Sequence, residues 1–219
     1  MAGHGGGIMK PGLILRDIHI RHDNGLDVGL DVEIAPGDIV TLMGPSGSGK
    51  SSLLNYICGL LPSGFHGQGE VWLDGMRLDL LPAQQRGIGI LFQDDLLFPF
   101  MSVAGNLGFG LSAKYRGKAR AVAVEKALED AGLAGFGGRD PATLSGGERA
   151  RISLMRALLA EPKALLLDEP FSKLDQNLRE NFRQFVFAAA KARHLPVLMV
   201  SHDIADAKAA GGLILQLGD

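Results

Sequence analysis

Residues 44–51 read Gly44-Pro45-Ser46-Gly47-Ser48-Gly49-Lys50-Ser51, and the rest of this 219-residue chain can be interpreted from them. They follow an apolar run at residues 39–43 that indicates a buried strand, and residues 52–58 after them indicate a helix. A glycine-rich loop between a strand and a helix lets backbone N–H groups converge on one anion, and the helix N-terminus adds the positive end of its dipole. This arrangement predicts a phosphate site.

The loop matches the complete P-loop pattern G-x-x-x-x-G-K-[ST]. In that pattern Lys50 supplies positive charge to the β- and γ-phosphates, and the Ser51 hydroxyl is a ligand for Mg²⁺. We therefore expect residues 44–51, together with Ser52, to bind a nucleotide. The alternative is a glycine-rich surface turn beside an ordinary lysine, and the flanking strand and helix argue against it.

Composition limits the class of protein. The chain is 46% hydrophobic and 21% charged, which suits one α/β domain with room for a subdomain. The single cysteine, Cys58, is expected to be a buried small hydrophobe, so no disulfide framework is predicted and a reducing, cytosolic compartment fits. No segment has the apolar length of a membrane span, and the N-terminus lacks the apolar core of a signal peptide. We expect a chain that is soluble by itself.

The charge of the chain does not indicate binding to nucleic acid. The formal net charge is −2, and no long basic stripe is present. The densest basic cluster is Lys114, Arg116, Lys118 and Arg120, which we interpret as a solvated face in preference to a docking patch for anionic lipid or a partner.

The first part of the chain predicts a small antiparallel layer. Residues 1–12 are glycine-rich and are expected to be a flexible leader outside the fold, so the domain is predicted to cover residues 13–219. Alternating segments at residues 13–20 and 26–34 indicate two antiparallel strands. Residues 59–69 read as a turn-rich loop, and a short strand at residues 70–73 ends in the hairpin signal Asp74-Gly75.

The middle of the chain changes from strand to helix. An unbroken apolar run at residues 88–92 indicates a buried strand that ends at Gln93. Residues 94–160 carry helical patterns, with Val124, Leu128 and Ala131 on one face, and predict an inserted helical subdomain.

Within this segment, Ser145 and Glu148 have the spacing of a capping box. A helix that starts at Ser145 would leave N–H groups and the two glycines Gly146 and Gly147 open to an anion, so a second phosphate site is predicted there.

The last part of the chain adds two buried strands, at residues 164–167 and 197–200. Ligands of open parallel sheets bind outside the carboxyl ends of the strands. Five residues directly follow predicted strands and are expected to converge: Gly44, Gln93, Asp168, Glu169 and His202.

Two of these residues are carboxylates. Asp168 suits Mg²⁺, directly or through water, and Glu169 could orient or accept a proton from an attacking water. Taken alone, either one could be a helix cap or a solvated turn residue.

Several stretches together resemble the motifs of ABC transporter ATPase subunits. They are residues 44–51, Gln93, residues 144–148, residues 165–170, Asp175 and His202, which look like Walker A, the Q-loop, the signature, Walker B, the D-loop and the H-loop. The LSGG signature is the specific part, and the resemblance runs from about residue 13 onward. Residues 97–103 and 140–142 are similar to bacterial importer ATPases of the YnjD and thiamine-transporter types.

The resemblance implies an α/β P-loop NTPase fold with a mainly parallel central sheet, an antiparallel β subdomain and a helical subdomain. It implies an ATPase that uses ATP and Mg²⁺ and forms a head-to-tail homodimer on ATP binding. Integral membrane permease subunits and a solute-binding protein are the implied partners, and the implied location is cytoplasmic, at the inner face of the cell membrane. Import is favoured over export by the resemblance alone.

The resemblance also assigns roles to residues. Lys50 and the loop amides would hold phosphates, Ser51 and Gln93 would reach Mg²⁺, and Asp168 would support the metal. Glu169 would act on the water and His202 would contact the γ-phosphate. Ser145, Gly146, Gly147 and Glu148 would complete the site of the partner subunit. Taken alone, His202 would be interpreted as an ordinary core or surface histidine.

Two features depart from the family pattern. The region that commonly supplies an aromatic residue to stack on adenine reads Arg21-His22-Asp23, and His22 alone is available there. We therefore expect weaker stacking and a looser choice among nucleotides. Lys173 stands where the D-loop usually has a small residue, and the sequence offers no reason for it. The chain also stops soon after its last strand, so the C-terminal regulatory domain of some sugar-importer ATPases is not expected.

Two other classes of function fit parts of the pattern. A soluble ABC protein could use the same ATPase without transport, and an assembly scaffold is the form hardest to exclude. A plain P-loop kinase is disfavoured by the signature helix. For the transporter, the expected docking surface lies beside Gln93, where Phe98, Phe100 and Met101 are either exposed apolar anchors or subdomain core.

Overall fold

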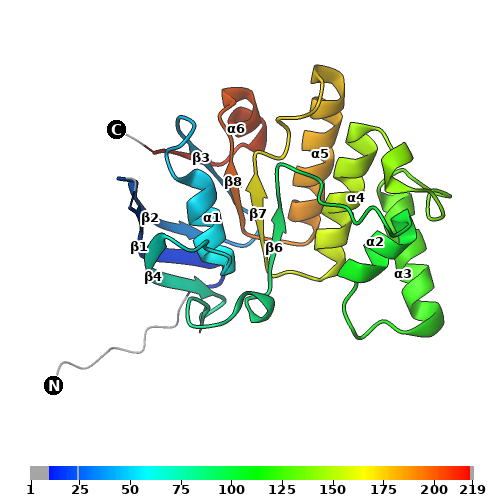
Figure 1. Cartoon of the computed structure of the whole chain (residues 1–219), viewed down its shortest axis with the longest axis horizontal. Coiled ribbons are helices and arrows are strands. Elements are labelled where there is room, and N and C mark those ends of the chain that lie inside the picture. The colour runs from blue at the N-terminus through cyan, green and yellow to red at the C-terminus, as the bar shows by residue number, and fades with distance from the viewer. Residues whose placement is uncertain (1–9, 24, 218–219) are drawn as a thin grey trace.

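The computed structural model describes residues 10–23 and 25–217, and Figure 1 shows two sheets and the helices around them. The elements are β1 Leu13–His22, β2 Asp27–Ile34, β3 Ile39–Met43, α1 Lys50–Cys58, β4 Phe65–Leu73, β5 Met76–Arg77, η1 Ala83–Gln85, β6 Ile88–Leu91, α2 Val103–Gly110, α3 Gly117–Asp130, η2 Pro141–Thr143, α4 Gly146–Leu159, β7 Ala164–Asp168, α5 Gln176–Ala192, β8 Val197–Val200, α6 Ile204–Ala210 and β9 Leu213–Gln216. The fold is the predicted α/β type.

The central sheet is parallel, with strand order β6-β7-β8-β3-β9. Its strands are the apolar runs of the sequence, because a strand covered on both faces needs apolar side chains at every position. In β7, Leu165 and Leu167 join one hydrophobic core and Leu166 joins the other, as the pleat requires. This sheet therefore separates two cores.

A second sheet, antiparallel with order β2-β1-β4-β5, covers one side of α1 and the central sheet. The predicted hairpin at Asp74 is confirmed by the pairing of β4 with β5. The prediction of a loop over residues 59–69 is wrong for its last part, because β4 already begins at Phe65. Two glycines at residues 67 and 69 conceal the strand in the sequence, and pairing with the ten-residue β1 creates it.

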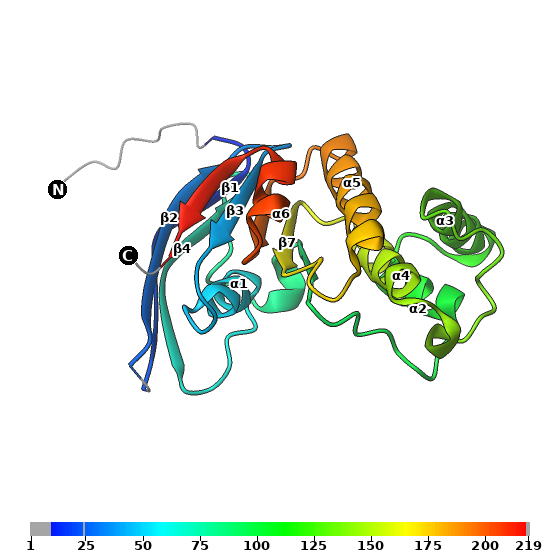
Figure 2. The same cartoon turned by 90° about the horizontal axis from the view of Figure 1, so that it is seen from above.

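Helices α2, α3, α4 and α5 lie on the other side of the central sheet, and α2 and α3 stand away from it as a separate lobe in Figure 2. Val124 and Leu128 of α3 are buried there with Ala131, as the sequence pattern predicts. Cys58, at the end of α1, is buried in the opposite core, also as predicted.

Of the predicted leader, residues 1–9 lie outside the described residues. Gly12 is attached to the fold, since its N–H donates to the Asp74 side chain at 3.0 Å and its carbonyl accepts from the Asp74 N–H at 3.0 Å. Within the described part of the chain, no helix is both long and apolar enough to span a bilayer.

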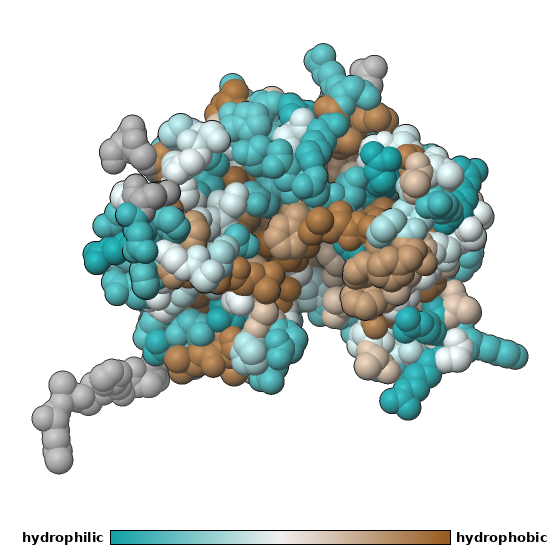
Figure 3. All heavy atoms as spheres, in the orientation of Figure 1, coloured by the Kyte–Doolittle hydropathy of each residue, from teal (hydrophilic) through white to brown (hydrophobic). Residues whose placement is uncertain are grey.

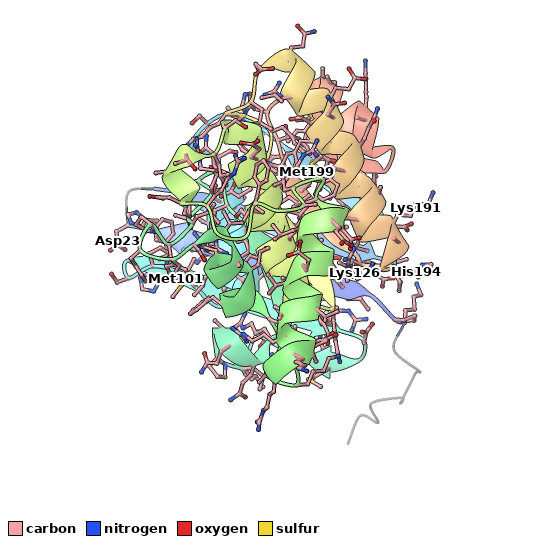
Figure 4. All side chains as sticks on the ribbon, turned by 90° about the vertical axis from the view of Figure 1, so that its right-hand side faces the viewer. Asp23, Met101, Lys126, Lys191, His194 and Met199 are labelled. Carbon is pink, nitrogen blue, oxygen red and sulfur yellow. The ribbon has the colours of Figure 1, made fainter. Side chains whose placement is uncertain are left out.

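The two ends of the central sheet face opposite sides of the molecule. In Figure 4, Asp23 and Met101 lie on one side, and Lys191 and His194 at the end of α5 lie on the other, with Met199 of β8 between them. Lys191 lines a cavity with Asp38 and Ile39 at the start of β3, so its side of the molecule holds the amino ends of the strands. The carboxyl ends, where the predicted site residues follow their strands, therefore face the side of Asp23.

Candidate functional site

The carboxyl ends of β3, β6 and β7 meet at one cavity of about 360 Å³. The described residues that line it are Leu26, Ser46, Gly47, Gly49, Lys50, Ser51, Ser52, Phe65, Gln93, Asp168 and Glu169. The structure therefore brings the predicted P-loop together with the predicted polar residues at the strand ends, although they lie far apart in the sequence.

The P-loop backbone needs glycine at two of its positions. Gly47 and Gly49 have φ angles of 82° and 92°, which side chains rarely adopt. A β-carbon at Gly49 would also lie 2.7 Å from Val28, so β2 packs directly against the loop. Helix α1 then begins at Lys50, with its N-terminal N–H groups at the loop.

Lys50 is buried at the centre of the loop, with 5% of its surface exposed. Its ammonium donates to the carbonyl oxygens of Gly44 at 2.8 Å and Pro45 at 2.6 Å, and it lies 3.4 Å from the Ser48 hydroxyl. A buried ammonium needs such partners, and here the loop itself fixes the position of the charge.

Ser51 and Asp168 connect the P-loop helix to the end of β7. The Ser51 hydroxyl donates to Asp168 Oδ1 at 3.0 Å. Burial raises the pKa of the Asp168 carboxyl, and Glu169 next to it acts in the same direction, while the Ser51 hydrogen bond and Lys50 oppose the shift. The site thus places a desolvated carboxyl beside a hydroxyl.

Glu169 and His202 face each other across the ends of β7 and β8, with Glu169 Oε2 3.0 Å from His202 Nδ1. Glu169 has a φ of 46°, a conformation uncommon for a residue with a side chain. Its backbone is fixed on both sides, because its N–H donates to Val200 and its carbonyl accepts from the Ser172 hydroxyl at 2.9 Å. Gln93 Nε2 donates to the same Ser172 hydroxyl at 3.2 Å.

Helix α4 begins with the predicted capping box. The Ser145 N–H donates to Glu148 Oε2 at 2.7 Å, and the Glu148 N–H lies 3.4 Å from the Ser145 hydroxyl. The hydrogen bond from the Ser145 backbone lowers the pKa of Glu148. Among the described residues that line the P-loop cavity, none belongs to residues 145–148; Gly146 lines a separate cavity of about 70 Å³.

Comparison with known proteins assigns this chain to a family. The family model described as "ABC transporter" matches residues 28–172. The chain belongs to the ABC transporter ATP-binding family. As an ABC ATPase it carries an ATP-hydrolysing cassette, as the resemblance of its motifs predicts.

Several relatives of this ABC ATPase are informative. The chain is 51% identical over 203 residues to the ABC transporter ATP-binding protein YnjD of Escherichia coli, covering 92% of this chain and 94% of YnjD. It is 46% identical over 174 residues to the sulfate/thiosulfate import ATP-binding protein CysA of Gloeobacter violaceus, covering 78% of this chain and 49% of CysA. The chain thus spans about half the length of that CysA relative.

Solved structures support the same fold. A dimeric structure of the ATP-binding cassette MJ0796, bound to ADP and Pi in a post-hydrolysis state, is 30% identical. The match has a TM-score of 0.77 and covers 94% of each chain.

Two features of the ABC ATPase site escaped the sequence interpretation. Phe65 lines the cavity, although the sequence predicted a loop there. Lys173 forms an ion pair with Asp94, directly after Gln93, and so ties the loop after Glu169 to the loop after β6. This contact explains the lysine at position 173. The sequence pattern could not reveal it, because 79 residues separate the two partners.

Proposed function

We propose that this ABC ATPase drives solute transport by binding and hydrolysing ATP at the interface of a head-to-tail homodimer. The observation that carries the proposal is the separation of two phosphate-type sites in one chain. The P-loop and the capped N-terminus of α4 lie on opposite sides of β6 and β7 in Figure 1, and the first does not share its cavity with residues 145–148. A second copy would bring the two together.

The proposed division of roles follows the positions of the residues. Residues 44–52 hold the phosphates through backbone N–H groups and the Lys50 ammonium. Ser145, Gly146, Gly147 and Glu148 serve the ATP bound by the other copy, because the helix N-terminus adds N–H donors to the γ-phosphate. Helices α2, α3 and α4 form the helical subdomain within residues 94–160 that presents this N-terminus.

The residues at the end of β7 fit Mg²⁺. The Ser51 hydroxyl and the Asp168 carboxylate are oxygen donors 3.0 Å apart, and Gln93 adds an amide oxygen to the same cavity. No cluster of three or more His, Cys, Asp or Glu side chains suited to a metal occurs in residues 10–23 and 25–217. Few protein ligands are typical of Mg²⁺, which keeps waters and shares the substrate phosphates. When bound, the metal would neutralise phosphate charge.

Glu169 is proposed to handle the attacking water. Its fixed backbone and the contact with His202 hold the carboxylate at the edge of the cavity, where it can accept a proton from water. His202 is proposed to orient this carboxylate and to contact the γ-phosphate. Gln93, which now bonds to Ser172, is proposed to turn towards the metal site.

Import through separate membrane permease subunits is the proposed use of this activity. The name of the CysA relative describes an import ATP-binding protein, which supports import over export. The chain would act on the cytoplasmic side, at the inner face of the cell membrane. A solute-binding protein would complete the importer.

An apolar groove of about 560 Å³ is the proposed docking surface for a permease. Leu96, Phe98 and Phe109 line it, with Leu96 and Phe109 exposed, and Figure 3 shows apolar spheres around the hollow between the two lobes. Of the three expected anchors, Phe100 is exposed, and its ring centroid lies 5.6 Å from that of Phe98. Phe98 lies in this groove, whereas Phe100 and Met101 line a different pocket.

The test replaces groove residues by charge. Phe98→Asp, and the more exposed Phe109→Asp, should reduce co-sedimentation with inside-out membrane vesicles of the native organism by about tenfold, because a docked carboxylate would be desolvated without a partner. ATP hydrolysis should stay close to that of the unaltered chain.

Val122→Asp is the matched control, since Val122 is exposed on α3 and outside the residues that line the groove. Unchanged co-sedimentation of both groove variants would refute the docking surface.

A further inference from the structure

The P-loop cavity has an apolar end that the phosphate chemistry does not use. Among the described residues that line it, Leu26 and Phe65 are the two with apolar side chains. They come from the connection between β1 and β2 and from the first position of β4. Neither side chain carries a hydrogen-bonding group, so this wall suits a flat, apolar surface beside a phosphate chain.

Phe65 is held in place by its neighbours. It pairs with His22 in the register between β1 and β4, and the two ring centroids are 4.2 Å apart at an interplanar angle of 53°. The Phe65 N–H donates to the Pro62 carbonyl at 3.3 Å, and Gly64 turns the chain with a φ of 86°. Aromatic cross-strand pairs of this kind stabilise each other.

His22 has a different position from Phe65. It is half-buried against the Phe65 ring, and it is not among the described residues that line the cavity. Contact between rings therefore makes His22 a support for Phe65, and Phe65 presents the aromatic surface to the cavity.

We propose that the nucleobase stacks on Phe65 and that His22 is a positioning residue for this ring. The inference rests on the proposed nucleotide site and names its base-binding surface. It moves that surface from residues 21–23, before the P-loop, to the start of β4 after it. Every base has an apolar face, so stacking on Phe65 and Leu26 discriminates poorly between adenine and guanine.

The experiment compares ligands with and without a base. Isothermal titration calorimetry measures the binding of ADP, GDP and pyrophosphate, none of which is subject to hydrolysis of a γ-phosphate. Phe65→Ala should weaken ADP and GDP by about tenfold or more, the range measured for loss of a stacked base, and should leave pyrophosphate unchanged. Phe65→Trp should keep the affinity for ADP.

The role of His22 has its own comparison. His22→Ala should weaken ADP less than Phe65→Ala does, and His22→Phe, which keeps a ring against Phe65, should restore the affinity.

Four results would overturn the inference. They are wild-type affinity for ADP in Phe65→Ala, an equal loss for pyrophosphate, a larger loss in His22→Ala than in Phe65→Ala, and no recovery in His22→Phe. A wild-type chain that binds neither ADP nor pyrophosphate would overturn the proposed nucleotide site itself, which distinguishes the two failures.

Discussion

Burial sets the chemistry of single side chains around the P-loop. The buried Lys50 side chain is surrounded by three oxygens of its own loop, which supply the polar partners that a buried charged group needs. Asp168 is desolvated in the same region, and the pKa of its carboxyl is raised for that reason. Both side chains therefore have polar partners within the protein. A bound phosphate would replace partners of Lys50, and a bound metal would replace the Ser51 hydrogen bond of Asp168.

Cys58 offers a test of burial at the residue scale. Burial raises the pKa of its thiol to about 11. Between the unfolded pKa near 9 and the folded value, the unfolded chain loses this proton while the folded chain keeps it, so stability falls as pH rises.

We expect the difference in unfolding free energy between the unaltered chain and Cys58→Ala to shrink by about 2 kcal/mol from pH 8.5 to pH 10.5. Urea unfolding at the two pH values measures it, and other titrating groups cancel in the comparison. A difference that does not depend on pH would contradict the assigned burial.

At the scale of elements, α1 is fixed at both ends. Its N-terminus continues directly from the phosphate loop, and its last carbonyls accept hydrogen bonds from Arg86, which is 7% exposed. Arg86 Nη1 donates to the carbonyls of Tyr56 and Ile57 at 2.8 Å each, and Nε donates to Leu81 at 2.9 Å. A cation at a helix C-terminus satisfies carbonyls that have no partner within the helix.

Removal of this cap should be costly. We expect Arg86→Ala to lower the free energy of unfolding by about 3 kcal/mol, because buried carbonyl oxygens lose their donors. Arg16→Ala, at an exposed position of β1, should change it by less than about 0.5 kcal/mol. Chemical denaturation of both variants provides the measurement, and equal effects would show that Arg86 does not act as a buried cap.

Local patterns in the sequence predict most elements of this fold. Apolar runs locate β3, β6, β7 and β8, and the capping box locates the start of α4, since these signals depend on nearby residues. The start of β4 at Phe65 could not be found this way, because pairing with β1 creates it. Site residues at the strand ends can be predicted because they directly follow apolar runs in the sequence. Phe65 and the Lys173–Asp94 pair cannot, because their positions depend on contacts between residues distant in sequence.

At the scale of the whole molecule, two surfaces are proposed to work together. The nucleotide cavity lies at the carboxyl ends of the parallel strands, and the apolar groove is lined by β6, α2 and α4. The segment after β6 belongs to both, because Gln93 lines the cavity and Leu96 lines the groove. We therefore propose that movement of Gln93 on nucleotide binding shifts Leu96 and so changes the proposed docking groove.

Nucleotide-dependent dimerisation is the central claim, and size-exclusion chromatography of Glu169→Gln tests it most directly. This variant should bind ATP but hydrolyse it far more slowly, because the phosphate and metal ligands remain and the proton acceptor is lost. Glu180→Gln, at an exposed position of α5, is the matched control for the loss of one carboxylate and should hydrolyse ATP normally.

We predict that Glu169→Gln elutes as a monomer alone and as a dimer with Mg-ATP. Adding Ser145→Arg to it should abolish the dimer while ATP still binds, because the arginine would obstruct the N-terminus of α4 and leave the P-loop cavity intact. A Glu169→Gln chain that holds ATP and remains monomeric at every concentration, or a dimer that Ser145→Arg does not disturb, would contradict the head-to-tail site.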